Sequence, residues 1–309
     1  MRYGGKMDAD LELGELRRFL AVVEAQSFRA AAERLGMAQP PLSRAIARLE
    51  EKLRTRLFER TTRHVAPTPA GLVLVEQARL VLAAAEAAAR RTTRAGAKKT
   101  QLIVAIKPGS GLPLLRRIVA RFEQASPGVR AHVLLGKWGD SLAMLADGRA
   151  DVALLRGPLT FPGLDAEPLF TEPRCVALAA SHPLAKKRSL LRRDLAGLPV
   201  PIIAGVDATL KAYRAAVDRD PTVDVPDGPV IGDLSALLDA VALGQGIAFL
   251  GRSTAKYHPR TDLRYVAVDD ISPSTVYVAW SETSRSRDVA RFVRLARDLA
   301  AGKKAADLA

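Results

Sequence analysis

The chain contains a single cysteine, Cys175, among 309 residues. One thiol cannot form a disulfide within the chain, and a protein without disulfides suits a reducing cytoplasm. No run of about 18 apolar residues, the length that a membrane-spanning helix needs, occurs in the sequence. Residues 1–20 hold four acidic side chains and lack the apolar stretch of a signal peptide. We therefore predict a cytoplasmic protein with no membrane partner.

Patterns that carry catalysis or bind cofactors are also missing. The four histidines, at positions 64, 132, 182 and 258, lack the spacing of a metal site, and we interpret them as surface or hydrogen-bonded residues. "PGSG" lacks the first glycine of a nucleophile elbow. "GQG" at residues 244–246 has Phe249 at the later position where a dinucleotide-binding fingerprint needs Gly or Ala. "AGAKKT" lacks the preceding glycine that a phosphate-binding loop needs. We predict no enzyme, no metal and no cofactor. Loss of a substrate without DNA would reveal an enzyme instead.

Positive charge is abundant. The formal net charge is +14 and the isoelectric point is about 10.3, which makes a polyanion the expected partner. Residues 1–66 carry a net +4 and residues 67–99 another +4, so more than half of the surplus lies in the first third of the chain. Nucleic acid binding is therefore expected in that part.

The composition and the hydrophobic periodicity of the sequence change along the chain and predict an α/β protein in three parts. Residues 1–66 contain short helical patterns, residues 67–98 contain one long alanine-rich helix, and residues 99–309 alternate apolar strands with helices. This order predicts an all-α head, a connecting helix and an α/β body.

In the head, three short helices follow one another. "GELRRFLAVVEAQ" has apolar residues at helical spacing, Ser27 stands at an N-cap position, and Gly36 suits a left-handed helix end. A third helix opens at "AQPPLS", where Pro40 and Pro41 fit a first turn because the N–H groups they lack would have no partner there. The head therefore resembles a helix-turn-helix in its spacing.

The third helix has two different faces. Leu42, Ile46, Leu49 and Leu53 line one side, and the other side presents Gln39, Ser43, Arg44 and Arg48. Arg can bind guanine edges and Gln can bind adenine edges in the major groove of DNA. The alternative is an ordinary solvated polar face, which the full helix-turn-helix spacing makes less attractive.

Residues 19–71, "FLAVVEAQSFRAAAERLGMAQPPLSRAIARLEEKLRTRLFERTTRHVAPTPAG", resemble the DNA-binding segment of LysR-type transcriptional regulators. The "AQPPLSR" form is similar to members that regulate the breakdown of aromatic compounds. The resemblance implies a winged helix-turn-helix in which Gln39, Pro40, Ser43 and Arg44 contact bases. It implies a wing in which Arg63 enters the minor groove and Thr61 or Thr62 binds phosphate. We add Ser27, Pro41 and Arg48 to the predicted DNA-binding residues.

The connecting helix shows a coiled-coil pattern. Thr68 and Pro69 supply an N-cap and a first helical residue. Apolar residues then recur at spacings of four and three, at Leu74, Ala78, Val81, Ala85 and Ala88. A monomer would expose this stripe, so we predict a dimerisation helix; the alternative is a helix packed on its own chain. A dimer would bind an interrupted palindrome, and the resemblance also implies tetramers, which leaves dimer or tetramer open.

The body begins with a β-α-β-α-β order, and a second such unit starts at "RCVALA". The family resemblance implies two Rossmann-like subdomains, as in periplasmic binding proteins, with an inducer in the cleft between them. We expect subdomain I at residues 99–170 and 271–309 and subdomain II at residues 171–270. A solute-binding protein is the rival interpretation of the body, and the helix-turn-helix argues against it.

The resemblance also implies where the inducer binds. The predicted contacts are Gly109, Ser110, Gly111, Trp138, Arg156, Ala204 and Gly205. The start of the helix after Gly111 and the Arg156 guanidinium would hold a carboxylate, so we expect a small organic anion. The alternatives are a helix cap for Ser110, a surface ion pair for Arg156 and core packing for Trp138. The expected partners are promoter DNA at the nucleoid, the inducer, further copies of the chain and RNA polymerase.

Overall fold

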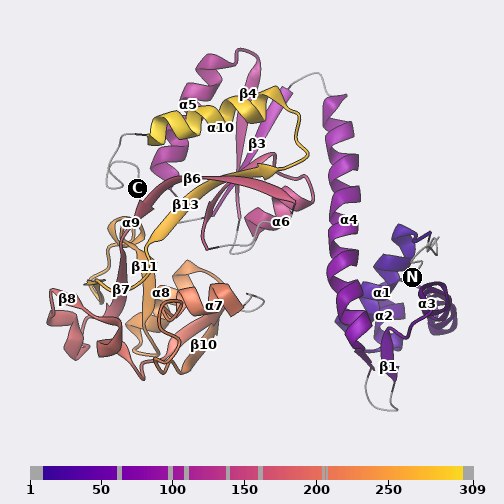
Figure 1. Cartoon of the computed structure of the whole chain (residues 1–309), viewed down its shortest axis with the longest axis horizontal. Coiled ribbons are helices and arrows are strands. Elements are labelled where there is room, and N and C mark those ends of the chain that lie inside the picture. The colour runs from indigo at the N-terminus through magenta and orange to yellow at the C-terminus, as the bar shows by residue number, and fades with distance from the viewer. Residues whose placement is uncertain are drawn as a thin grey trace, which may run out of the picture. The chain divides into compact units, whose positions relative to one another are not determined.

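The computed structural model of the chain (Figure 1) describes residues 10–60, 65–96, 100–107, 111–136, 140–158, 163–203, 206 and 208–301. The chain forms two compact units that divide after Thr92. The first unit holds the head and most of the long helix, and the second holds the α/β body. Within the described residues, no helix combines the length and the apolarity that crossing a bilayer would require.

The head consists of three helices and a two-stranded wing. The helices are α1 (Leu13–Ala25), α2 (Phe28–Arg34) and α3 (Gln39–Leu53), and the wing strands are β1 (Phe58–Arg60) and β2 (Val65–Pro67). The two strands are antiparallel, with Phe58 opposite Pro67. Leu42, Ile46 and Leu49 of α3 are fully buried in a core shared with α1 and α2. The apolar face predicted for α3 is therefore confirmed.

Local signals in the head act as the sequence predicts. The Ser27 hydroxyl accepts a hydrogen bond from the backbone N–H of Ala30 at 3.3 Å and caps α2. Gly36, just beyond α2, has φ +64°, a conformation that favours glycine. Pro40 and Pro41 lie in the first turn of α3, which starts at Gln39. The turn and the start of α3 are thus fixed by three short-range effects.

The wing is fastened to the helices by one carboxylate and one aromatic ring. Glu50 of α3 accepts hydrogen bonds from the backbone N–H groups of Leu57 at 2.8 Å and Phe58 at 3.2 Å. The Phe58 ring packs against Phe19 and Phe28 at centroid distances of 5.3 and 5.8 Å. These contacts hold the base of the wing in a fixed position relative to α3.

The long helix α4 (Pro69–Ala95) starts against the wing. Thr68 caps it by accepting a hydrogen bond from the Gly71 N–H at 3.0 Å, as predicted. A Cβ at Gly71 would collide with the carbonyl oxygen of Leu57, so only glycine permits this close approach. The start of α4 and the end of the head are therefore a single packed structure.

The expectation that a single chain exposes the whole predicted stripe of α4 is wrong. Ala78 is 1% exposed and Leu74 is partly buried, because both pack on the head of the same chain. Val81 and Ala88 are exposed and Ala85 is intermediate. The first two positions of the stripe thus pack on the head of their own chain, which was the alternative interpretation.

The body contains a five-stranded sheet of order β4-β3-β5-β13-β6, on which subdomain I is built. Its strands are β3 (Thr100–Ile106), β4 (Val129–Leu135), β5 (Val152–Arg156), β6 (Leu164–Glu172) and β13 (Ser274–Ser281). β3, β4 and β5 are parallel, and β13 pairs antiparallel with β5 and β6. The helices are α5 (Leu112–Ala125), α6 (Asp140–Ala146) and α10 (Arg287–Ala300). Phe122 of α5 and Phe292 of α10 meet edge to face at 5.6 Å in the core over the sheet.

Subdomain II lies between β6 and β13 in the chain. A four-stranded sheet of order β11-β7-β12-β8 contains β7 (Arg174–Ala179), β8 (Ser189–Leu190), β11 (Ala248–Gly251) and β12 (Leu263–Val268). A separate parallel pair joins β9 (Val200–Ile203) and β10 (Asp227–Ile231). The helices are α7 (Ala208–Arg214), α8 (Leu234–Ala242) and α9 (Arg252–Tyr257), with two short 3₁₀ turns, η1 (Pro183–Lys186) and η2 (Arg192–Leu195). The chain crosses between the subdomains twice, at Pro173 and at residues 269–273.

Two buried arginines hold the end of α7. Arg174 donates through Nη1 to the carbonyl of Tyr213 at 2.6 Å and through Nε to the carbonyl of Ser272 at 2.6 Å. Arg192 donates through Nε to the carbonyl of Ala215 at 3.1 Å. Positive charge at a helix C-terminus satisfies carbonyls that have no intrahelical partner. Arg174 thereby links the end of α7 to Ser272, in the segment where the chain returns to subdomain I.

Candidate DNA interface and effector site

The start of α3 is the exposed polar surface that the sequence predicts. Gln39, Pro40, Arg44 and Arg48 are exposed, and Pro41 and Ser43 are half-buried. In the described part of the chain, neither Arg44 nor Arg48 forms an ion pair, whereas Lys52 on the same helix pairs with Glu15 at 2.8 Å. The two arginines of this surface are thus available to an external anion.

The remaining predicted DNA contacts differ in what the structure says of them. Ser27 is half-buried and acts as the cap of α2, and its hydroxyl is already engaged with Ala30. Thr61, Thr62 and Arg63 lie outside the described residues, between β1 and β2. The base of β1 is held on α3 by Glu50, and β2 pairs with β1.

A second exposed apolar surface lies on α4. Leu72, Val73, Leu80 and Val81 are 55%, 61%, 48% and 46% exposed. Val73 and Leu80 are seven residues apart and therefore share one face of the helix, as in a heptad repeat. This face is opposite the one that packs on the head through Ala78. The side of α4 that could meet a second chain is therefore rotated from the stripe predicted from sequence.

In the body, cationic residues gather at the carboxyl edge of the first sheet. Lys107 directly follows β3 and Arg156 ends β5, and these strands are neighbours with Ile106 opposite Leu154. The Lys107 side chain is half-buried, and loss of solvation, together with the charges of Arg214 and Arg156, lowers its pKa to about 7. Since Arg214 belongs to α7, this edge joins cations from both subdomains.

Arg156 is held by the protein on three sides. Its Nη1 donates to Glu172 Oε1 and to Ser274 Oγ, both at 2.6 Å, and its Nη2 donates to Ser253 Oγ at 3.2 Å. The ion pair considered as the alternative for Arg156 therefore exists, but it is buried between strands and is not at the surface. A ligand carboxylate would not find a free bidentate guanidinium here.

Glu172, the partner of Arg156 in this ion pair, connects the two subdomains through its hydrogen bonds to Ser253. It ends β6 in the first sheet, and its carboxylate accepts hydrogen bonds from the backbone N–H and the hydroxyl of Ser253 at 2.7 and 2.6 Å. Ser253 belongs to α9 of subdomain II. Because Arg156, Glu172 and Ser253 are all bonded to one another beside the first crossing, they set the position of α9 relative to the sheet edge.

The other predicted inducer contacts are only partly described. Gly111 precedes α5 and has φ +86°, a conformation that favours glycine, whereas a Cβ there would make only ordinary contacts with Phe170 and Val276. Gly109, Ser110, Trp138, Ala204 and Gly205 lie outside the described residues. Gly111 is thus explained by its backbone conformation.

Sequence reasoning missed Lys107, Glu172 and Arg214 as residues of this region. Lys107 carried a usable signal, because it follows the buried strand "QLIVAI" directly and ligands in α/β sheets bind at the carboxyl ends of strands. Arg214 had none, since its position on α7 matters only once that helix is brought against the first sheet edge.

A winged helix-turn-helix with an exposed recognition helix, joined to a two-subdomain α/β unit, defines a ligand-responsive DNA-binding regulator. Residues 13–72 match the family model "Bacterial regulatory helix-turn-helix protein, lysR family", and residues 95–301 match "LysR substrate binding domain". The chain belongs to the LysR family of transcriptional regulators. The predicted fold class is confirmed, as is the prediction of a regulator and not an enzyme.

Known relatives agree with this assignment over nearly the whole chain. HTH-type transcriptional regulator BudR of Raoultella terrigena is 30% identical over 298 residues, which cover 92% of this chain and 100% of the relative. HTH-type transcriptional regulator BenM of Acinetobacter baylyi is 29% identical over 290 residues, covering 89% and 95%. The crystal structure of full-length BenM matches with a TM-score of 0.54 at 28% identity, covering 94% of this chain and 96% of that one.

A third relative carries a more specific name. A probable hydrogen peroxide-inducible genes activator of Mycobacterium avium is 37% identical over 223 residues, which cover 65% of this chain and 70% of the relative. That shared segment is shorter than the match to BudR, although the identity within it is higher. All three relatives support the family. Of their names, the third alone states an inducing compound, hydrogen peroxide.

Proposed function

We propose that this regulator binds an interrupted palindrome as a homodimer or a dimer of dimers and responds to a small organic anion in its body. The observation that carries the proposal is the exposed start of α3, which presents Gln39 and Arg44 on a rigid head. Two such heads related by a two-fold axis would contact two half-sites of one operator. The regulator would act on DNA in the cytoplasm, at the nucleoid, where RNA polymerase is the partner that an activating response requires.

The exposed face of α4 supports the oligomer. A helix that keeps Val73 and Leu80 in water loses the stabilisation that their burial would give, about 25 cal/mol for each Å² removed from water. Pairing this face with the same face of a second copy buries both side chains symmetrically. The helix α4 is therefore the proposed contact between two chains.

The proposed domain organisation keeps the head at residues 1–66, the connecting helix at 67–98 and the effector-binding part at 99–309. The proposed effector site is the edge where Lys107, Arg156 and Arg214 come together. Lys107 and Arg214, one from each subdomain, favour an anionic ligand, because an anion there compensates for the lost solvation and the repulsion that lower the pKa of Lys107. Arg156 contributes less, since it is already paired with Glu172. Gly109 and Ser110 come shortly after Lys107 in the sequence, and Trp138 comes after the neighbouring strand β4. These residues, together with Ala204 and Gly205 after β9, stay among the proposed contacts.

A thiol-based response to peroxide is not proposed. Cys175 is the one cysteine of the chain, it is buried in β7, and burial raises the pKa of its thiol to about 12. Peroxide reacts with the thiolate and not with the thiol, so this side chain is unreactive at neutral pH. The name of the mycobacterial relative therefore does not transfer to this chain on the basis of cysteine chemistry.

The proposed effector site predicts that anion affinity increases as the pH falls. Lys107 is mostly neutral at pH 8 and mostly charged at pH 6, because its pKa is lowered to about 7. A small carboxylate selected by thermal shift on the full chain should bind about tenfold more tightly at pH 6 than at pH 8. Arg214, whose charge acts on Lys107, stays charged throughout this range because its pKa is lowered only to about 10. Isothermal titration calorimetry at the two pH values measures the change.

Two variants decide whether Lys107 is responsible. Lys107→Gln should bind the same carboxylate weakly at both pH values, and Lys107→Arg should bind it with little dependence on pH. An unchanged tenfold pH effect in Lys107→Gln would show that another group titrates and that the anion lies elsewhere.

A further inference from the structure

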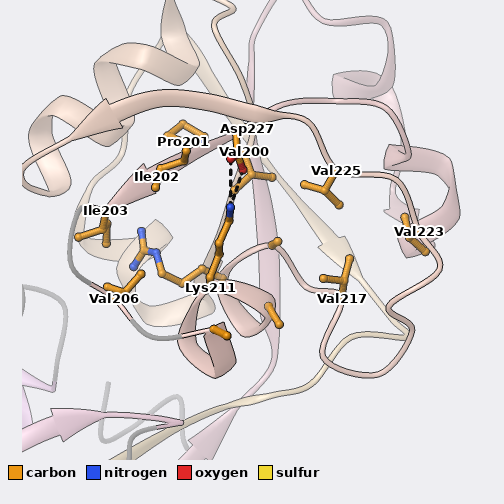
Figure 2. Close-up of a pocket in the computed structure, with 14 residues that line it drawn as sticks. Val200, Pro201, Ile202, Ile203, Val206, Lys211, Val217, Val223, Val225 and Asp227 are labelled. Atoms are coloured by element: carbon orange, nitrogen blue, oxygen red, sulfur yellow. Dashed lines mark hydrogen bonds and ion pairs between the residues drawn. The ribbon is translucent and has the colours of Figure 1, made fainter. Parts of the chain in front are cut away.

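A pocket of about 310 Å³ lies in subdomain II between α7 and the β9–β10 pair (Figure 2). This volume is at the lower end of the range found for small-molecule sites, about 300–1,000 Å³. All of its lining residues fall between Val200 and Asp227. The pocket is therefore formed by one subdomain alone, whereas Lys107 and Arg156 of the proposed effector site belong to the other.

The walls of the pocket are almost entirely aliphatic. Eleven of the fourteen lining residues are apolar, and most of these are branched. Figure 2 shows Val217, Val223 and Val225 along one side and Ile203 and Val206 along the other. Among the described residues, no hydroxyl, amide or aromatic side chain lines it. Sugars and nucleotides would leave their hydroxyl groups without partners here, so the walls favour an apolar body.

Among the described residues, three charged side chains complete the lining. Lys211 and Arg214 of α7 are basic and Asp227 of β10 is acidic, so these described side chains carry a net charge of +1. A neutral ligand would gain nothing from this charge, and a cation would be repelled by it. A single negative charge on the ligand matches the lining.

The ion pair in this pocket is suited to exchange. Lys211 Nζ lies 3.0 Å from the Asp227 carboxylate, and the two side chains are 54% and 55% exposed. Exposed pairs of this kind contribute little to stability, so a ligand carboxylate can replace Asp227 at little cost. Arg214 is more buried, and burial lowers its pKa to about 10 because the charged form is poorly solvated. An anion beside Arg214 would compensate for that lost solvation.

We propose that this pocket binds a small monocarboxylate with a branched aliphatic or aromatic body. The body lies among Val217, Val223 and Val225, and the carboxylate lies at α7 between Arg214 and Lys211. The pocket and the proposed effector site at Lys107 share Arg214, and their other described residues differ, so variants outside Arg214 can distinguish the two sites.

The first test compares four probes on the full-length protein by isothermal titration calorimetry. 4-Methylpentanoate and benzoate combine an apolar body with a carboxylate, 4-methylpentanamide lacks the charge, and acetate lacks the body. We expect the first two to bind at least tenfold more tightly than the amide and acetate. No binding of either carboxylate at 10 mM, or equal binding of the amide, would overturn the proposal.

The second test locates the binding with substitutions. Ala212→Phe and Val217→Phe each fill the pocket from a different wall and should weaken 4-methylpentanoate at least tenfold, with circular dichroism confirming the fold. Lys211→Gln should weaken it severalfold, while Lys187→Gln, an exposed lysine outside the pocket, should not. Unchanged affinity in both phenylalanine variants would overturn the assignment.

A third variant separates this proposal from the effector site. Lys107→Gln should leave the binding of 4-methylpentanoate within twofold of the parent chain, because Lys107 is not part of the pocket. If Lys107→Gln abolishes binding and the two phenylalanine variants do not, the carboxylate lies at the sheet edge and the pocket is not its site. If Ala212→Phe and Val217→Phe fail to bind 4-methylpentanoate and Lys107→Gln still binds it, the pocket is the binding site, even if the proposed effector site proves wrong.

Discussion

Arg44→Ala should weaken binding to the specific operator by about 10- to 100-fold for each half-site while changing binding to scrambled DNA only slightly. Arg44 is exposed near the start of α3 and has no ion-pair partner in the described part of the chain. Its guanidinium can therefore bind a guanine edge through two hydrogen bonds, a contact of about 1–3 kcal/mol. Fluorescence anisotropy with labelled duplexes at fixed salt concentration measures both affinities.

The comparison with scrambled DNA distinguishes two roles of Arg44. Equal losses on the two duplexes would make Arg44 a phosphate contact, because phosphate binding carries no sequence information. Arg193→Ala removes an exposed arginine of the body and serves as the matched control. It should leave both affinities unchanged.

Leu80→Asp should convert the dimer to a monomer at concentrations where the parent chain is dimeric. Leu80 is 48% exposed in the single chain and lies one heptad after Val73 on the free face of α4. A carboxylate buried in a dry seam costs several kcal/mol, which is at least about 100-fold in the dimer dissociation constant. Sedimentation equilibrium measures this shift, and affinity for a full palindrome should fall with it.

A leucine elsewhere provides the matched control for this substitution. Leu243 is 73% exposed after α8, so Leu243→Asp makes the same chemical change outside α4. Its dimer should be as stable as that of the parent chain. A dimer that survives Leu80→Asp unchanged would place the contact between chains away from this face of α4.

The head was predictable because its signals are local. The N-cap at Ser27, the left-handed Gly36 and the prolines at the start of α3 act within one helical turn, and each is visible in a short window. The apolar spacing of α3 also identifies its buried face. A sequence whose local preferences agree with its fold in this way can be interpreted without knowing its long-range contacts.

The stripe on α4 shows where periodicity stops being informative. Spacings of four and three mark an apolar face, but they do not say what covers it. Leu74 and Ala78 belong to that face, and the head of the same chain covers them. The second apolar face, with Val73 and Leu80, was not distinguishable in the sequence, because leucines and valines occupy all of residues 72–75 and 80–82 and fit either side of the helix.

The strand β6 was missed for a different reason. Its sequence "LDAEPLFTE" contains three acidic residues and Pro168, which are unusual in a strand. β6 lies at the edge of the sheet, where proline and charge are tolerated, and the register shifts opposite Pro168. Edge strands therefore resemble loops in a single sequence.

The charges of the body could not be placed from sequence because their partners are distant along the chain. Arg156 bonds to Glu172, Ser253 and Ser274, which lie 16, 97 and 118 residues away. The proximity of Lys107 to Arg156 of β5 and Arg214 of α7 depends on the same long-range packing. Only the carboxyl edge of the sheet, and not the set of side chains on it, followed from the order of strands and helices.

Selection of bound fragments from the genomic DNA of the source organism tests the central claim most directly. Full-length protein and the Arg44→Ala variant are each incubated with sheared DNA, and the retained fragments are sequenced. The account predicts a small set of enriched promoter fragments that share an interrupted palindrome with half-sites about one helical turn apart or a multiple of it, lost in Arg44→Ala. Retention of DNA without any shared sequence, or the same enriched set with Arg44→Ala, would contradict it.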